Sequence, residues 1–321
     1  MFAQMSSVLL RGATPAGPDI GPRTGTTPPT GTIDVRLRDG FVAEVGTLVA
    51  AADEDVVDLD GYVLSPAAVE PHAHLDKAFL AERIVNPTGD LHGAVVAMRE
   101  HRHLLDVPET VERAERAARR MAASGYRAVR THADCTHDHG LRSVEALAEV
   151  RRRVADAIDV EIVALCGWPV LGPEGADHRA LLPAALDAGA DVVGGCPHLE
   201  PTGDTQAATD FFLQVATDRA VSVDLHTDEV LDPAVLGLVD LLEAVESGFA
   251  HPVTASHCVS LGMQESHRQQ EIAELVAQAG IDIVALPHTN LFLQGRGWAP
   301  MPRGLTAVAA LRSAGVNVAA G

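Results

Sequence analysis

Residues 67–77, which read AAVEPHAHLDK, place a strand-like apolar run directly before two histidines, His72 and His74. Similar runs recur through the rest of the chain, and longer segments with helical periodicity separate them. Alternation of strands with helices predicts a parallel sheet that helices cover. The runs predict eight strands, at residues 67–72, 127–132, 161–166, 191–195, 222–226, 253–257, 282–287 and 316–320.

Eight strands over about 250 residues fit a (β/α)₈ barrel. The fold class is therefore predicted as α/β, with a TIM-like barrel over residues 65–321. A doubly wound open sheet is the competing architecture, but it needs a glycine-rich turn after the first strand, where this chain has Pro71-His72-Ala73-His74. The chain stops at Gly321, so the barrel is expected to end within its eighth strand. Helices are predicted at residues 109–124, 143–157, 177–188, 204–219, 233–247, 266–279 and 304–314.

Residues 1–64 differ from the barrel region because they carry only short strand-like pieces. The pair Asp39-Gly40 lies between two alternating runs and predicts a β-hairpin. A segment of this length is too short to hold a hydrophobic core of its own, so it is predicted as a small β element. Its strands are expected at residues 8–10, 33–37, 41–45 and 56–59, with a loop rich in Gly, Pro and Thr at residues 12–31.

Composition excludes several classes of protein. Apolar residues make up 47% of the chain and charged residues 21%, as in soluble globular proteins. The 44 acidic and 24 basic residues give a net charge of -20, which disfavours nucleic acid as a partner. No apolar run approaches the roughly 18 residues that span a bilayer, and residues 1–12 lack a signal-peptide pattern. The four cysteines form no C-x-x-C pair, so a reducing, cytoplasmic location is expected.

Histidines stand where a barrel carries its reactive groups, at the carboxyl ends of the strands. His72 and His74 share one face of an extended segment, and His226 at the end of the fifth predicted strand supplies a third imidazole. Three protein ligands with one open position suit a catalytic divalent metal. The alternative for each ring is a buried histidine bonded to a backbone carbonyl. Three further predicted strands also end in a histidine, at His132, His257 and His288.

Two residues near these histidines are candidates for proton transfer. Glu229 follows His226 by three residues and is placed to reach a metal-bound water, although a glutamate near a helix N-terminus is also stabilised by the helix dipole. His257 ends the sixth predicted strand and faces the same space, where it can hydrogen-bond the water or polarise a carbonyl-like group. A purely structural role is the alternative for His257.

The chain resembles the amidohydrolase superfamily, and within it the cytosine deaminase-like metal-dependent hydrolases. The resemblance runs along the whole chain and implies a distorted (β/α)₈ barrel with a small β-sandwich built from both chain ends. The matching segments are residues 69–77 (VEPHAHLDK), 129–134 (VRTHAD), 197–202 (PHLEPT), 226–229 (HTDE), 253–257 (VTASH) and 290–296 (NLFLQGR).

This resemblance implies roles for single residues. His72, His74 and His226 match the metal histidines, Glu229 matches the proton-shuttling glutamate, and His257 matches the histidine that orients the hydrolytic water or the substrate. Binuclear members carry a carboxylated lysine at the end of the fourth strand. This chain has none there, so one divalent ion is expected, zinc or iron, with manganese as a further option. The substrate-side candidates are Lys77, His198 and Gln294.

The implied reaction is deamination of a nucleobase-like or other N-heterocycle by a metal-activated water. Cytosine deaminases carry a glutamine after the third strand that reads the pyrimidine edge, and residues 166–169 here read CGWP, so cytosine itself is not implied. One alternative is cleavage of a cyclic amide or an N-substituted amine at the same site. Another is an inactive truncated relative, since the family's fourth ligand, an aspartate, would follow Gly321. A small heterocycle is the expected partner, and a second copy of the chain is left open.

Overall fold

The computed structural model describes residues 7–16 and 31–321 and divides into two compact units, Met1–Ala67 and Ala68–Gly321. The first unit holds one small sheet, in which β1 pairs antiparallel with β2 and parallel with β4 and β5, and β2 pairs with β3. Its strands are β1 (Val8–Pro15), β2 (Ile33–Arg38), β3 (Phe41–Gly46), β4 (Asp55–Asp58) and β5 (Val63–Leu64).

The predicted hairpin at Asp39-Gly40 is present. Both residues have positive φ, 52° and 81°, and Arg38 pairs with Phe41 across the turn, as a two-residue hairpin requires. The predicted loop over residues 12–31 is wrong at its start, because β1 continues to Pro15. A bulge beside Gly12, whose φ is 76°, lets this strand bend and pair first with β2 and then with β5. Residues 17–30 of that prediction lie outside the described residues.

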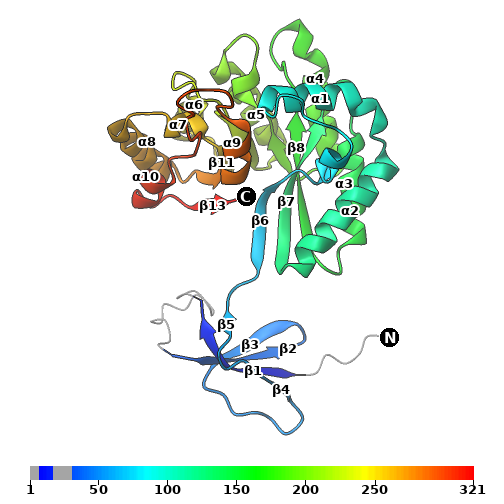
Figure 1. Cartoon of the computed structure of the whole chain (residues 1–321), viewed down its shortest axis with the longest axis vertical. Coiled ribbons are helices and arrows are strands. Elements are labelled where there is room, and N and C mark those ends of the chain that lie inside the picture. The colour runs from blue at the N-terminus through cyan, green and yellow to red at the C-terminus, as the bar shows by residue number, and fades with distance from the viewer. Residues whose placement is uncertain (1–6, 17–30) are drawn as a thin grey trace. The chain divides into compact units, whose positions relative to one another are not determined.

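The second unit is a nearly closed barrel of eight parallel strands in sequence order, surrounded by helices (Figure 1). The predicted barrel is confirmed, and each predicted apolar run overlaps one strand. A Cβ built on Gly321, after the last strand, would lie 3.1 Å from His72 Cβ, so the two ends of the sheet approach each other. The strands are β6 (Ala68–Ala73), β7 (Tyr126–Cys135), β8 (Asp159–Cys166), β9 (Val192–Gly194), β10 (Val223–Thr227), β11 (Val253–His257), β12 (Asp282–Ala285) and β13 (Val318–Ala320).

Seven helices overlap the seven helical predictions. Their limits follow local capping: the Asp106 side chain accepts a hydrogen bond from Glu109 N at the start of α2, and Gly280, with φ of 67°, ends α8. These helices are α2 (Val107–Ala123), α3 (Arg142–Arg153), α4 (Ala176–Asp187), α5 (Thr205–Arg219), α6 (Gly237–Glu246), α8 (Ser266–Ala279) and α10 (Val308–Ser313). The hydrophobic core lies between them and the sheet, with Phe212, Leu147 and Leu182 among its largest buried side chains.

Two helical predictions began too early. α6 begins at Gly237 instead of residue 233, because the buried Asp228 carboxylate accepts hydrogen bonds from Gly237 N and Leu238 N and so defines the first turn. α10 begins at Val308 instead of residue 304. None of the helices in the described ranges is long and apolar enough to cross a membrane.

Several short elements were not predicted. α1 (Leu91–His101), α7 (Val259–Gly262) and α9 (Pro287–Leu293) pack over the carboxyl end of the barrel or follow its strands directly. The prediction that His288 ends a strand is wrong: β12 stops at Ala285, Pro287 begins α9, and His288 is exposed. The 3₁₀ turns are η1 (Leu75–Lys77), η2 (Leu80–Glu82), η3 (Arg102–Leu104), η4 (Pro173–Gly175) and η5 (Pro197–Leu199).

Candidate active site

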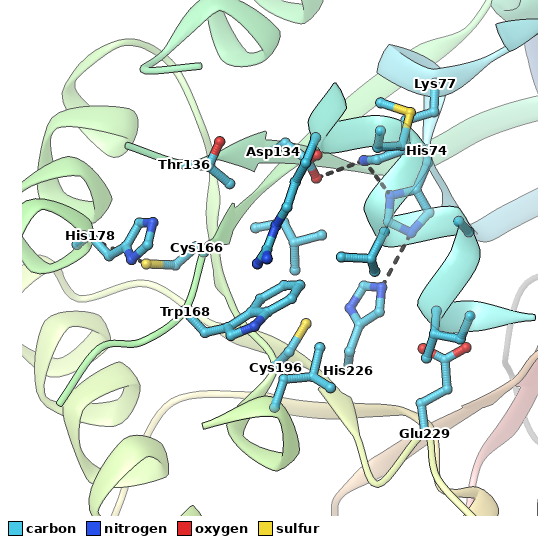
Figure 2. A pocket seen from close by; sticks show the side chains of 18 of the residues that line it. His74, Lys77, Asp134, Thr136, Cys166, Trp168, His178, Cys196, His226 and Glu229 are labelled. Carbon is cyan, nitrogen blue, oxygen red and sulfur yellow. Dashed lines mark hydrogen bonds and ion pairs between the residues drawn. The ribbon is translucent and has the colours of Figure 1, made fainter. Parts of the chain in front are cut away.

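Three of the predicted histidines meet at the carboxyl end of the barrel. His72 lies in β6, His74 follows that strand, and His226 lies in β10, and each offers one nitrogen within 4.8 Å of the others. The Nε2 atoms of His74 and His226 are 3.2 Å apart. Figure 2 shows the two rings pointing toward each other. The fold therefore brings together side chains that are 152 residues apart in the sequence.

The donor set fits a divalent metal ion. Two imidazole nitrogens bound to one tetrahedral zinc at about 2.1 Å would lie about 3.4 Å apart, close to the spacing of His74 and His226. His72 Nε2 is buried and has no hydrogen-bond partner among residues 7–16 and 31–321. Burial lowers the pKa of all three histidines well below the ordinary value, so the rings are neutral and keep a lone pair free for a ligand bond.

A fourth imidazole, that of His132, belongs to the same cluster and was not assigned a role from the sequence. Its ring lies 4.0 Å from that of His72, centroid to centroid, and 4.7 Å from that of His226. The side chain is fully buried, and neither ring nitrogen has a hydrogen-bond partner within the described chain, although Nε2 lies 3.9 Å from Asp224 Oδ1. The sequence placed His132 at the end of the predicted strand 127–132 and within the matching segment 129–134, but no role was assigned to it.

A buried carboxylate lies beneath these rings. Asp224, on β10, is fully buried, accepts a hydrogen bond from Ser256 Oγ at 2.9 Å, and pairs with Arg130 Nη1 at 2.9 Å. Burial raises the pKa of Asp224 to about 6, and the neighbouring Arg130 opposes that rise. Arg130 also binds Glu161, at 2.6 Å, so its charge is shared between two carboxylates. The carboxylate thus has partners in the barrel interior, which the sequence pattern did not reveal.

Glu229 and His257 lie beside the histidine cluster, as predicted from the sequence. Glu229 Oε1 is 3.4 Å from His257 Nδ1, and His257 Nδ1 also contacts Asn290 Oδ1 at 3.0 Å. Because an amide oxygen only accepts, His257 Nδ1 carries a hydrogen, which in the neutral imidazole leaves the lone pair on Nε2. Burial raises the pKa of Glu229, with His257 acting in the opposite direction. The pair therefore combines a proton acceptor of raised pKa with an oriented imidazole.

A cavity of about 800 Å³ opens over these groups. Glu229 and His257 line it together with the metal-site histidines, and Trp168 forms part of the opposite wall. The Arg99 guanidinium lies 5.3 Å from the centre of the Trp168 ring. Figure 2 shows the Trp168 indole between His178 on one side and His226 on the other. Trp168 and the histidine cluster thus both line the cavity, and a cavity with an aromatic side chain in its wall suits a planar ligand.

The three substrate-side candidates occupy different places. Lys77 lines the cavity, but its Nζ is bound by Asp134 at 2.7 Å and by Asp76 at 3.2 Å. Burial alone would lower the pKa of Lys77, but the two carboxylates outweigh burial and raise this pKa. His198 does not line this cavity, and its Nδ1 donates to the His226 carbonyl at 3.0 Å. Gln294 lines an adjoining cavity and donates to the Glu229 carbonyl at 3.0 Å. Their contact with substrate stays a prediction.

An eight-stranded barrel with a histidine cluster at the carboxyl ends of its strands has the architecture of barrel enzymes that work through a metal centre. The chain belongs to the amidohydrolase family, whose model matches residues 86–321. It is 35% identical over 296 residues to a pterin deaminase of Rhizobium rhizogenes, covering 89% of this chain and 66% of that protein. It is 23% identical over 263 residues to the N-isopropylammelide isopropyl amidohydrolase of a Pseudomonas species, covering 78% and 63%.

Two solved structures are also similar to this chain over nearly its whole length. The 5-methylcytosine deaminase of Klebsiella pneumoniae, liganded with 5-fluorocytosine, superposes with a TM-score of 0.83 at 30% identity, over 98% of this chain and 74% of that one. The N-isopropylammelide isopropylaminohydrolase of Burkholderia multivorans gives 0.77 at 26% identity, over 99% and 74%. The chain spans two thirds or less of the length of the two curated relatives named above.

Proposed function

We propose that this chain carries the barrel of a metal-dependent hydrolase that deaminates a planar N-heterocycle, such as a nucleobase-like ring. The observation that carries the proposal is the cluster of His72, His74 and His226 with the buried Glu229 beside it, all facing one cavity. The names of two relatives, a pterin deaminase and a 5-methylcytosine deaminase, support the same reaction.

The three imidazoles would hold one divalent ion, zinc or iron, with manganese as a further option. A bound ion of this kind supplies Lewis acidity, which lowers the pKa of water to about 7. The histidine side chains contribute neutral nitrogen donors, because burial keeps them unprotonated. His132, fully buried beside His72, helps to exclude solvent from the cluster.

Glu229 is assigned the proton transfer. Its pKa is raised by burial, so the carboxylate is a stronger base than an exposed one. It would take a proton from the attacking water and deliver it to a ring nitrogen of the substrate. It would then carry the remaining proton of the newly bound hydroxyl to the amino group, which leaves as ammonia when the C–N bond breaks. His257 Nε2 bears a lone pair, has no partner among the described residues, and accepts a hydrogen bond from the water that it orients. Trp168, which lines the cavity, would stack against a flat ring.

The same site also suits cleavage of an N-substituted amine or a cyclic amide. This second reaction is supported by the N-isopropylammelide relatives, whose names describe removal of an isopropyl amine. We also propose a reducing, cytoplasmic location, which is supported by the four cysteines, all free and buried. A second copy of the chain as a partner stays a prediction.

Metal analysis and ammonia release test the proposal together. The protein is assayed with pterins, pyrimidines, purines and triazines, with isopropylamine release measured in parallel. We expect about one divalent ion per chain and activity that is lost in His72→Ala and on treatment with a chelator. His288→Ala is the matched control, because this histidine is exposed outside the cluster. Activity that survives both His72→Ala and the chelator would refute the proposal.

A further inference from the structure

We propose that Ser256 and Asp224 are positioning residues that fix the tautomer of His72, so that its Nε2 atom is the one offered to the metal ion. The inference rests on the proposed function, since it concerns a residue that would bind that ion. It adds two residues to the site that neither the sequence pattern nor the family match assigns.

The contacts form one continuous series of hydrogen bonds that runs into the barrel interior. His72 Nδ1 is 2.9 Å from Ser256 Oγ, and Ser256 Oγ is 2.9 Å from Asp224 Oδ1. Ser256 and Asp224 are fully buried, and His72 is 4% exposed. Ser256 lies on β11 in register with His226 on β10, so the hydroxyl is held at the level of the histidine cluster.

Assigning the hydrogens along this series of hydrogen bonds leaves a single arrangement of donors and acceptors. Arg130 Nη1 donates to Asp224 Oδ2 at 2.9 Å, and its positive charge favours the carboxylate form, whose other oxygen, Oδ1, accepts from Ser256 Oγ. The one hydroxyl hydrogen of Ser256 therefore points to Asp224. Ser256 Oγ then has only lone pairs left for His72, so His72 Nδ1 must carry the ring hydrogen.

The consequence falls on the other ring nitrogen. With its hydrogen on Nδ1, His72 presents a bare lone pair at Nε2, which is the buried nitrogen without a hydrogen-bond partner in the described part of the chain. The opposite tautomer would direct an N–H group at the ion and remove one of the three ligands. Outer partners of this kind commonly change metal affinity by about 10- to 100-fold.

Two readouts test the inference on the whole protein. Zinc affinity is measured by competition with a chromophoric chelator, and the His72 tautomer is measured in the metal-free protein by ¹⁵N NMR of labelled histidine, with His72→Asn for assignment. We expect Nδ1–H in the wild type, mixed tautomers and about 10- to 100-fold weaker zinc binding in Ser256→Ala, and recovery in Ser256→Thr. Ser143→Ala removes another buried serine hydroxyl, on α3, and should match the wild type in both readouts.

Asp224→Asn provides a second variant of nearly unchanged volume. The amide can donate to Ser256, which turns the hydroxyl hydrogen toward His72, so we expect the ring hydrogen to move to Nε2. Thermal unfolding of each metal-free variant reports whether it folds. An Nε2–H tautomer in the wild type, or wild-type zinc affinity in folded Ser256→Ala, would overturn the inference. A wild-type protein that binds no metal would instead refute the proposed function, and the NMR measurement would still decide the tautomer.

Discussion

At the scale of single residues, the histidine cluster places polar nitrogens where water does not reach. His72, His132 and His226 each keep a buried ring nitrogen without a partner inside the described ranges. An unpaired buried polar group costs about 1–3 kcal/mol, so holding these rings together lowers the stability of the fold. Burial also lowers their pKa values well below the ordinary value and keeps them neutral, which is the form that binds a metal ion.

Glu229 gives the first prediction at this scale. Glu229→Gln keeps the shape of the side chain but removes the proton acceptor, so we expect kcat to fall by about 10²- to 10⁴-fold, with KM changed much less. Steady-state ammonia release measures both. Glu243→Gln, on the exposed face of α6, is the matched control and should stay within about 2-fold of the wild type. Wild-type kcat in Glu229→Gln would show that another group transfers the proton.

The pKa of Glu229 also predicts a pH dependence. The group acts as a carboxylate in the free enzyme, so activity is lost as the pH falls through its pKa. Burial raises that pKa above 4.5, and the acid limb of kcat/KM is therefore expected at higher pH than for an exposed glutamate. The acid limb is measured by recording kcat/KM as a function of pH with a substrate that has no titrating group of its own. A limb at or below pH 4.5 would contradict this assignment.

At the scale of elements, the small N-terminal sheet is held by a buried ion pair. Arg36, on β2, donates from Nε to Glu54 Oε1 at 2.7 Å, and Ser7 Oγ donates to the same oxygen at 2.5 Å. These hydrogen bonds lower the pKa of Glu54 to about 2. The pair joins β2 to the loop before β4, so its charge state bears on whether the sheet stays assembled.

This ion pair predicts acid sensitivity. Because the pKa of Glu54 is lower in the folded protein, its contribution to stability is present above about pH 4.5 and is lost as the pH falls toward about 2. Glu54→Gln should remove that contribution, so the variant loses less stability than the wild type over this range. The free energy of unfolding of each protein is measured by urea unfolding at several pH values. Asp53→Asn, at an exposed residue outside this ion pair, should behave like the wild type, and equal acid sensitivity in all three proteins would refute the prediction.

The elements also show why much of the barrel could be predicted from the sequence. Strands β8, β10 and β11 are buried along most of their length, so they appear as continuous apolar runs, and α2 and α8 carry their own capping signals. α1 was missed although Asp90 caps it by accepting a hydrogen bond from Gly93 N, because only Gly93 and Ala97 are buried in it, and α9 was missed because it has only seven residues. His132 and the partners of Asp224 were missed because contacts between distant strands leave no local signal.

At the scale of the whole molecule, a bound metal would link early and late parts of the barrel. His74 follows β6 and His226 lies on β10, 152 residues further along the chain. The hydrogen-bonded sheet already joins these strands through β7, β8 and β9, but only in sequence order. An ion held by both histidines would connect them directly across the barrel end. Since only the folded chain brings these side chains together, metal binding must stabilise the folded state.

This linkage gives the last prediction. With free zinc at about 100 times its dissociation constant, the folded state gains about 2.7 kcal/mol, which corresponds to a rise in Tm of about 5–10 °C for a unit of this size. Thermal unfolding with zinc and with chelator measures the difference. His226→Ala should abolish most of it, whereas His288→Ala, an exposed histidine outside the cluster, should keep it. A Tm that does not depend on metal in the wild type would mean that the cluster does not hold an ion, because binding confined to the folded chain cannot leave its stability unchanged.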